Sequence, residues 1–136
     1  AVFGLFTTIE AFVNLINNTG QIKISVEHEN DLEEVELPEK TSLALFRVLT
    51  QLVDNTLKHA NATEIKMIFG IHEADLTIAY QDNGKGFDME VLHQRSGIGM
   101  QNIQSRLQMI NATYQIQSSI GNGFKLNINY TLLPVE

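Results

Sequence analysis

Two neighbouring segments of this chain alternate between apolar and polar residues, and only residues 72–74 separate them. Residues 64–71 carry an apolar side chain at every second position, and residues 75–81 repeat the pattern. A period of two places the apolar side chains of each segment on one face of a sheet. The short connection is typical of a tight turn, so the two segments are expected to form an adjacent strand pair with one buried face.

Other segments have apolar residues at three- and four-residue spacing, which is the pattern of an amphipathic helix. Helices are therefore expected at residues 4–17, 41–59 and 100–110. The second has the longest pattern, and Thr41 or Ser42 is expected to cap its amino terminus. Each predicted helix has one apolar stripe, so each requires a surface to pack against.

Alternation also predicts three more strands, at residues 22–26, 113–119 and 124–132. The acidic run at residues 27–36 is expected to be an exposed loop with at most a short strand. Helices and strands mix without strict βαβ alternation, which favours helices on one face of a mostly antiparallel sheet. The predicted class is α+β, a two-layer α/β sandwich with a mixed, mostly antiparallel sheet of about five strands and three helices.

Composition limits the function classes that remain. A chain of 136 residues fits one domain, residues 1–136, and contains no cysteine, which excludes disulfides, cysteine zinc sites and thiol catalysis. The net charge of −7 disfavours broad binding to nucleic acid or to an anionic membrane surface. The chain begins at Ala1 without an initiator methionine, so it is expected to be a segment of a longer protein.

One polar stripe lies on the second predicted helix. Arg47, Gln51, Asn55 and Lys58 follow one another at spacings of four, four and three residues. The ordinary interpretation is a solvated helix face, and Asp54 with Lys58 has the spacing of a surface ion pair. Two amides and an ammonium in a row are also suited to a hydrated divalent cation and the phosphates that it bridges.

Three glycine-rich segments follow strands or precede a helix. The first and the third are also explained as simple turns, and the second, a lone Gly-x-Gly before a helix, is by itself a weak signal. In DNGKGF at residues 82–87, Asp82 could accept a hydrogen bond from an exocyclic amine, and the glycines allow a backbone to approach a planar ligand. GIGM at residues 97–100 precedes a helix, whose amino terminus favours anions. The third segment is GNG at residues 121–123, between two strands.

The order of these four features resembles the N, G1, G2 and G3 boxes of the Bergerat, or GHKL, ATP-binding fold. This fold is shared by histidine kinases, gyrase-type topoisomerases, Hsp90-type chaperones and MutL-type repair proteins. The segments LFRV at 45–48, DNTLKHANA at 54–62 and GIGMQNIQSRL at 97–107 look like the catalytic domains of NarL/DesK-type sensor histidine kinases. The similarity extends over residues 6–134.

The resemblance implies a role for each matching residue. Asn55 corresponds to the asparagine that coordinates Mg²⁺ between the ATP phosphates, Lys58 to a phosphate-binding lysine, and Asp82 to the aspartate that accepts the adenine amino group. Residues 88–96 correspond to a short, mobile ATP lid. The catalytic positions are Gln51, Asn55 and Lys58. The implied ATP-binding residues are Asn55, Lys58, His59, Asp82, Gly84, Gly86, Gly97, Ile98, Gly99, Met100 and Gly123.

Two positions depart from the family pattern. Gln51 stands where this subfamily commonly has glutamate, and an amide cannot accept the proton of an attacking water. This argues against hydrolysis by the gyrase route, whereas a kinase whose acceptor is a histidine ring tolerates the amide. Phe124 stands where the late Gly-x-Gly is usually followed by a threonine, whose hydroxyl helps to hold the adenine-binding aspartate and an ordered water.

The resemblance implies a cytoplasmic domain that binds ATP with Mg²⁺ and gives the γ-phosphate to a histidine. None of the chain's histidines lies in the family's acceptor motif, so the acceptor is expected on dimerisation helices before Ala1. The implied partners are those helices and a response-regulator receiver domain, with no nucleic acid, and the isolated domain is expected to be a monomer. Two alternatives remain open: a serine kinase of the anti-sigma-factor type, and a degenerate interaction module without catalysis.

Overall fold

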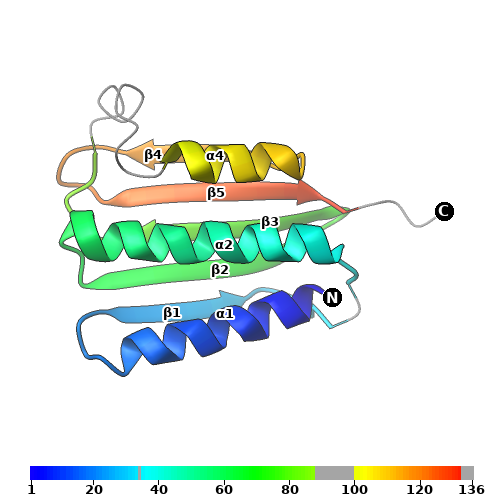
Figure 1. The fold of residues 1–136 in the computed structure, drawn as a ribbon, viewed down its shortest axis with the longest axis horizontal. Helices are drawn as coiled ribbons and strands as arrows, with labels where there is room; N and C mark the ends of the chain where they lie inside the picture. Colours follow the sequence, from blue (N-terminus) through cyan, green and yellow to red (C-terminus); the bar gives the residue numbers. More distant parts are fainter. Residues whose placement is uncertain (34, 88–99, 133–136) are drawn as a thin grey trace.

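A computed structural model describes residues 1–33, 35–87 and 100–132 of the chain. Helices and strands alternate irregularly along the sequence (Figure 1). In chain order they are α1 (Val2–Asn17), β1 (Lys23–His28), α2 (Glu39–Asn55), the π-helix η1 (Thr56–Ala60), β2 (Glu64–His72), β3 (Asp75–Asp82), α4 (Met100–Met109), β4 (Thr113–Ser118) and β5 (Phe124–Thr131).

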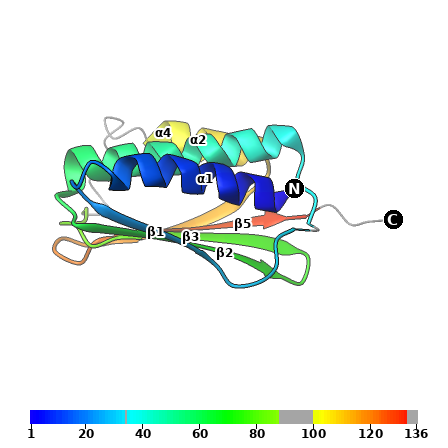
Figure 2. The same cartoon turned by 90° about the horizontal axis from the view of Figure 1, so that it is seen from below.

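The strands form one five-stranded sheet in the order β1-β2-β3-β5-β4. β1 pairs in parallel with β2, and the other three pairings are antiparallel. The helices α1, α2 and α4 lie together on one face of the sheet (Figure 2). The predicted two-layer α+β class is therefore confirmed, and β3 lies in the middle of the sheet under the helical layer.

The core fills the space between these two layers. β5 alternates between buried and exposed residues along its whole length, as its sequence predicts. Leu45, Leu49 and Leu52 bury one face of α2, and each is at most 2% exposed. The register places Tyr80 of β3 opposite Leu126 of β5, both facing the helices. Among the described residues, no helix is both long enough and apolar enough to cross a membrane.

The second helix differs from its prediction at both ends. It begins at Glu39 after Pro38, and the predicted cap by Thr41 or Ser42 is wrong. Proline fixes φ at a value compatible with entry into the helix, and its carbonyl accepts the amide of Ser42 at 2.9 Å. At the other end the α-helix ends at Asn55 and continues as η1, a π-helical turn of the kind that often marks a functional site.

The acidic segment also differs from its prediction. β1 continues to His28, so Glu27 and His28 pair with Ile68 and Phe69 of β2 instead of lying in a loop. The His28 ring packs edge-on against Phe6 of α1, with the ring centroids 4.9 Å apart. Parallel pairing with a long neighbouring strand extends β1 into residues whose own composition favours a loop.

Candidate functional site

Asp82 is the last residue of β3, and its side chain faces the helical layer at the centre of the sheet. The residue is only 9% exposed. Its Oδ2 accepts a hydrogen bond of 2.9 Å from the Thr56 hydroxyl, and its Oδ1 accepts one of 2.9 Å from the Gly84 amide. A buried carboxylate requires such donors, and two of them leave further lone pairs for a ligand.

Asn55 lies across from Asp82, at the junction of α2 and η1. Its Nδ2 atom is buried, and no described residue accepts a hydrogen bond from it. Buried polar groups are nearly always paired, so this amide, in the wall of the same cavity as Asp82, is available to an acceptor beyond the described residues, such as one that a ligand supplies. Phosphate oxygens are acceptors of this kind.

A small cavity of about 10 Å³ separates these groups, roughly the space of one water molecule. It lies between the end of α2, the end of β3 and the start of α4. Its lining residues are Leu52, Asn55, Thr56, Ala60, Asp82, Phe87, Met100 and Phe124. Apolar walls with a few polar groups are typical of a ligand site, and a planar base enters only if the lining side chains move apart.

The segment after Asp82 packs directly against η1. A Cβ added to Gly84 would lie 2.5 Å from the carbonyl oxygen of Ala60, and the Lys85 amide donates to that same oxygen at 2.8 Å. Asn83 is held from the other side, since its Oδ1 accepts the amides of Thr63 and Glu64. The absence of a side chain at residue 84 thus allows the helix end and the strand end to meet.

The same segment contacts the turn between β4 and β5. Gly86 has φ +70°, and a Cβ there would collide with the carbonyl oxygen of Ser119. The Phe87 amide donates to the Ser118 hydroxyl at 2.7 Å, and that hydroxyl donates to the Gly123 carbonyl at 2.8 Å. The predicted first and last glycine segments, residues 82–87 and 121–123, therefore form one packed unit beside Asp82.

Comparison with known proteins assigns the arrangement to a family. Residues 40–134 match the family described as histidine kinase-, DNA gyrase B- and HSP90-like ATPases. The chain belongs to this ATPase family. The matched region includes the segments that carry Asn55, Asp82 and the paired glycines.

Relatives and solved structures agree with this assignment. The chain is 30% identical to the sensor protein VraS of Staphylococcus epidermidis over 85% of its length, and 28% identical to the histidine-protein kinase/phosphatase DegS of Bacillus subtilis over 95%. It spans about a third of the length of either relative. The fold matches the blue-light activated histidine kinase EL346 of Erythrobacter litoralis with a TM-score of 0.78 at 20% identity, covering 94% of this chain and 42% of that one.

In this ATPase domain the remaining predicted polar residues lie outside the cavity. Lys58 forms an ion pair with Asp54 at 3.1 Å, as its spacing predicts, and both side chains are more than half exposed. His59 is exposed on η1, and Gln51 lies half-buried on α2, one turn before Asn55. None of Gln51, Lys58 and His59 lines the cavity, so the structure brings only Asn55 and Asp82 of this polar set together.

The second predicted glycine segment is represented by one residue. Met100 is the first residue of α4, is 4% exposed and lines the cavity. Gly97, Ile98, Gly99 and the expected lid at residues 88–96 lie outside the described residues. The structure therefore shows where the third helix begins relative to Asp82, and the roles expected for residues 97–99 stay predictions.

Two further polar residues of this site have no signal in the sequence. Thr56 and Tyr80 stand at apolar positions of their helix and strand patterns, where they count as core residues. In the structure the Tyr80 and Thr56 hydroxyls contact each other, and the Tyr80 hydroxyl donates to the Leu52 carbonyl at 3.0 Å. Burial, opposed by the hydrogen bond between the Tyr80 and Thr56 hydroxyls and reinforced by the nearby Asp82 charge, raises the pKa of Tyr80 far above its usual value. Tyr80 is thus a neutral phenol at ordinary pH.

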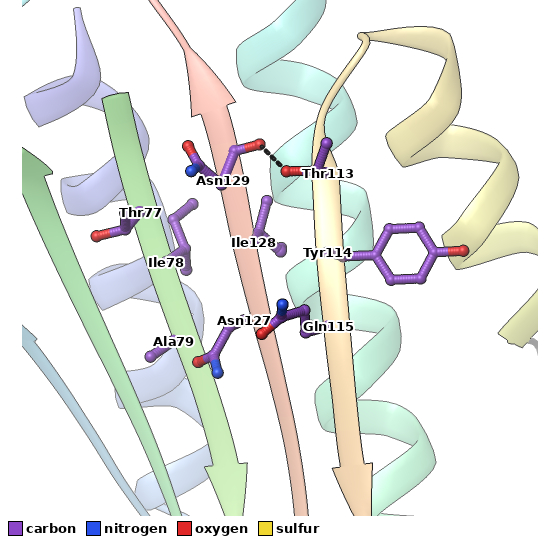
Figure 3. Close-up of a pocket in the computed structure, with 9 residues that line it drawn as sticks. All are labelled: Thr77, Ile78, Ala79, Thr113, Tyr114, Gln115, Asn127, Ile128 and Asn129. Carbon is purple, nitrogen blue, oxygen red and sulfur yellow. Dashed lines mark hydrogen bonds between the residues drawn. The ribbon is translucent and has the colours of Figure 1, made fainter. Parts of the chain in front are cut away.

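A wider depression of about 450 Å³ lies on the opposite face of the sheet, over β3, β5 and β4 (Figure 3). Polar residues such as Thr77, Gln115 and Asn127 line it together with apolar ones such as Ala79. None of the described residues that line it is charged, so they offer no group that would bind a phosphate as strongly as an ammonium would.

Proposed function

We propose that this chain is the nucleotide-binding part of a sensor histidine kinase. It binds ATP with Mg²⁺ and gives the γ-phosphate to a histidine on the dimerisation helices of the same kinase, from which an aspartate of a response-regulator receiver domain takes it. Membership of the ATPase family and similarity to VraS and DegS support this function. In this proposal the domain is cytoplasmic, is a monomer when isolated, and contacts no nucleic acid.

The buried carboxylate of Asp82 is the observation that carries the proposal. Two donors, the Thr56 hydroxyl and the Gly84 amide, hold its oxygens at the wall of the cavity. A carboxylate held in this way accepts a hydrogen bond from the exocyclic amino group of adenine and repels the carbonyl group at the same position of guanine or hypoxanthine. The site thus has a chemical reason to select adenine nucleotides.

Asn55 and Lys58 are proposed to hold the phosphate end. The buried Nδ2 of Asn55 lacks an acceptor among the described residues, which fits a neighbouring phosphate oxygen, and the oxygen of the same amide is a ligand type that Mg²⁺ accepts. Mg²⁺ bound there would neutralise charge on the phosphates. Lys58 would exchange its exposed partner Asp54 for a phosphate oxygen, a change that costs little in a pair so exposed.

Gln51 fits transfer to a histidine better than hydrolysis. Its amide cannot take the proton of an attacking water, whereas a histidine ring attacks without that help. In this proposal the domain contributes chiefly by positioning the γ-phosphate and by neutralising its charge. His59 is expected to face the nucleotide from η1, and residues 97–99 are expected to contribute amides to the phosphates.

Calorimetric titration of the chain with Mg-ADP and with a non-hydrolysable ATP analogue tests the proposal. We expect saturable one-to-one binding that Asp82→Asn reduces at least about a hundredfold, because the amide turns a donor toward the adenine amine. Asp75→Asn is the matched control, since Asp75 begins the same strand and contacts Asn129 at its far end. This variant should bind like the wild type.

The second candidate function is an interaction module that does not bind nucleotide. Phe124 favours it, because an aromatic ring occupies a position beside Asp82 and only a small cavity remains. A folded wild type that shows neither heat nor thermal stabilisation at millimolar nucleotide would establish this alternative, since even weak binding stabilises detectably there. An acceptor-histidine helix pair in the longer protein would exclude the serine-kinase alternative.

A further inference from the structure

A chain of buried polar groups runs from the core of the sheet to Asp82. Tyr80 is 1% exposed and Thr56 is 4% exposed, and their hydroxyls are in contact. Thr56 Oγ1 in turn lies 2.9 Å from Asp82 Oδ2. Apolar residues at positions 56 and 80 would serve the core equally well, so the packing of the two layers does not by itself require these hydroxyls.

The protons in this chain can be assigned from the donors available. An ionised carboxylate only accepts, so the hydrogen of the Thr56 hydroxyl lies on the bond to Asp82. Thr56 Oγ1 is then an acceptor toward Tyr80, and the single phenolic hydrogen is shared between Thr56 and the Leu52 carbonyl. Since Tyr80 stays neutral, it remains a donor over the ordinary pH range. The Thr56 hydroxyl is thereby held with its hydrogen toward Asp82.

The residue at position 124 is the reason why the hydrogen bond from Thr56 to Asp82 matters. Phe124 pairs directly with Asp82 in the antiparallel register of β3 and β5, so the two side chains share the face toward the helices. The phenyl ring of Phe124 supplies no hydrogen-bond donor to the carboxylate. The ring instead packs edge-on against Phe87 and Tyr80, with centroid distances of 6.0 and 6.3 Å.

We propose that Thr56, at the start of η1, positions the Asp82 carboxylate for the nucleotide base. Its hydroxyl donates the hydrogen bond that Phe124 on β5 cannot donate. This inference rests on the proposed adenine nucleotide binding. The Gly84 amide fixes one carboxylate oxygen and Thr56 fixes the other, so the plane of the carboxylate is set before a ligand arrives. Preorganisation of this kind increases affinity for the base that matches it.

The test compares Mg-ADP with Mg-IDP, whose hypoxanthine carries a carbonyl where adenine carries its amino group. Thr56→Val and Thr56→Ala both remove the hydroxyl, and Thr56→Ser keeps it. We expect the first two to weaken Mg-ADP binding by about tenfold or more and to change Mg-IDP binding by less than about twofold. Thr56→Ser should retain the preference for ADP. The dissociation constants are measured by calorimetry on the 136-residue chain.

A matched control lies on the same helix. The Thr50 hydroxyl donates to the Arg47 carbonyl within α2, so Thr50→Val removes a hydroxyl without touching Asp82, and both affinities should stay at the wild-type values. Thermal denaturation shows whether each Thr56 variant folds. If either Thr56→Val or Thr56→Ala does not fold, the ADP and IDP affinities are compared in the other variant. A purely structural role would weaken both nucleotides equally, and an unchanged ratio of ADP to IDP affinity in a folded variant would overturn the inference.

Failure of the two proposals can be told apart. A wild type that binds Mg-ADP more tightly than Mg-IDP, together with a Thr56 variant of unchanged preference, rejects only the role of Thr56. A wild type that binds neither nucleotide, or binds both equally, rejects adenine recognition by Asp82 and the inference with it.

Discussion

The two ends of the proposed nucleotide site are held in different ways. At the base end, Asp82 and Thr56 are buried, and hydrogen bonds join them to each other and to the backbone of Gly84. At the phosphate end, the Lys58 side chain on η1 is 64% exposed, and among the described residues it forms an ion pair only with Asp54 at the end of α2. Asn55 lies at the boundary, with a buried amide nitrogen and no described acceptor.

This difference separates what the fold fixes in advance from what a ligand must organise. A buried and paired carboxylate keeps its geometry without a ligand, because leaving any of its partners unpaired is costly. An exposed lysine keeps several positions open at little cost and responds to salt. The base end should therefore be sensitive to shape, and the phosphate end to charge and ionic strength.

The largest effect on stability and binding is expected from adding a side chain at Gly86, next to the base end of the site. In Gly86→Ala the new Cβ would meet the carbonyl oxygens of Ser119 and Gly123 at a φ of +70°. We expect the free energy of unfolding to fall by about 2 kcal/mol or more and Mg-ADP binding to be lost. Gly20→Ala is the control, because Gly20 has a φ of +76° with nothing within 4 Å of the added Cβ. Equal losses of stability in chemical denaturation of the two variants would contradict the contact with residues 119 and 123.

The second prediction uses Asn55→Ala to test whether the phosphate end and the base end of the site bind their parts of the nucleotide independently. We expect Mg-ADP affinity to fall by about tenfold or more and to become the same with Mg²⁺ as with a chelator. Adenosine, which has no phosphates, should bind this variant and the wild type equally, because Asp82 is untouched. Asn14→Ala on the exposed side of α1 serves as the control. A loss of adenosine binding in Asn55→Ala would show that the two ends are not independent.

The third prediction concerns the buried phenol at the base end. Because the pKa of Tyr80 is raised in the folded state, its contribution to stability is complete below the unfolded value of about 10 and is lost as the pH rises above it. The free energy of unfolding should decrease above that pH by up to about 1.4 kcal/mol per pH unit through this group. Denaturant titrations between about pH 9 and 11 should show a shallower decrease in Tyr80→Phe, and a wild-type decrease in Tyr114→Phe.

The smallest effects are expected at the phosphate end. Lys58→Ala should change the free energy of unfolding by less than about 0.5 kcal/mol, because an exposed i,i+4 pair contributes little. Its Mg-ADP affinity should fall a few-fold at low salt, with the difference shrinking as ionic strength rises. Asp54→Ala frees the ammonium and should raise that affinity slightly. Titrations at two salt concentrations decide this, and a salt-independent loss in Lys58→Ala would contradict a charge effect.

Much of the fold could be predicted because the periodicities of the sequence are strong. The strand pair at residues 64–71 and 75–81 exists within a residue of its predicted ends, and β5 buries the face that its alternation selects. The errors fall where neighbours override local preference. β1 extends into the acidic segment because β2 offers a parallel partner, and α2 starts at Glu39 because Pro38 fixes the entry.

The candidate site divides in the same way. Asp82 and its glycines stand out in the sequence, because a carboxylate and paired glycines at the end of a strand suit both a turn and a ligand. Thr56 and Tyr80 could not be found, since a threonine or tyrosine at an apolar position satisfies the helix or strand pattern without revealing a hydrogen bond. The resemblance to the family showed that Phe124 replaces the usual threonine, but it did not indicate that Thr56 supplies a hydroxyl to Asp82 instead.

The sequence by itself determined which residues face the core, which predicted strand leads into Asp82 and which segments turn on glycine, because these follow from spacing along the chain. Only the tertiary structure decided that Thr56 meets Asp82, that the turn after β4 packs on Gly86, and that η1 closes on Gly84. These contacts join residues from 24 to 33 positions apart, and they form only when the helical layer, the strands and their turns pack at particular positions on one another. Local periodicity sets the face that a helix buries, while its position along the sheet depends on the side chains of every neighbouring element at once.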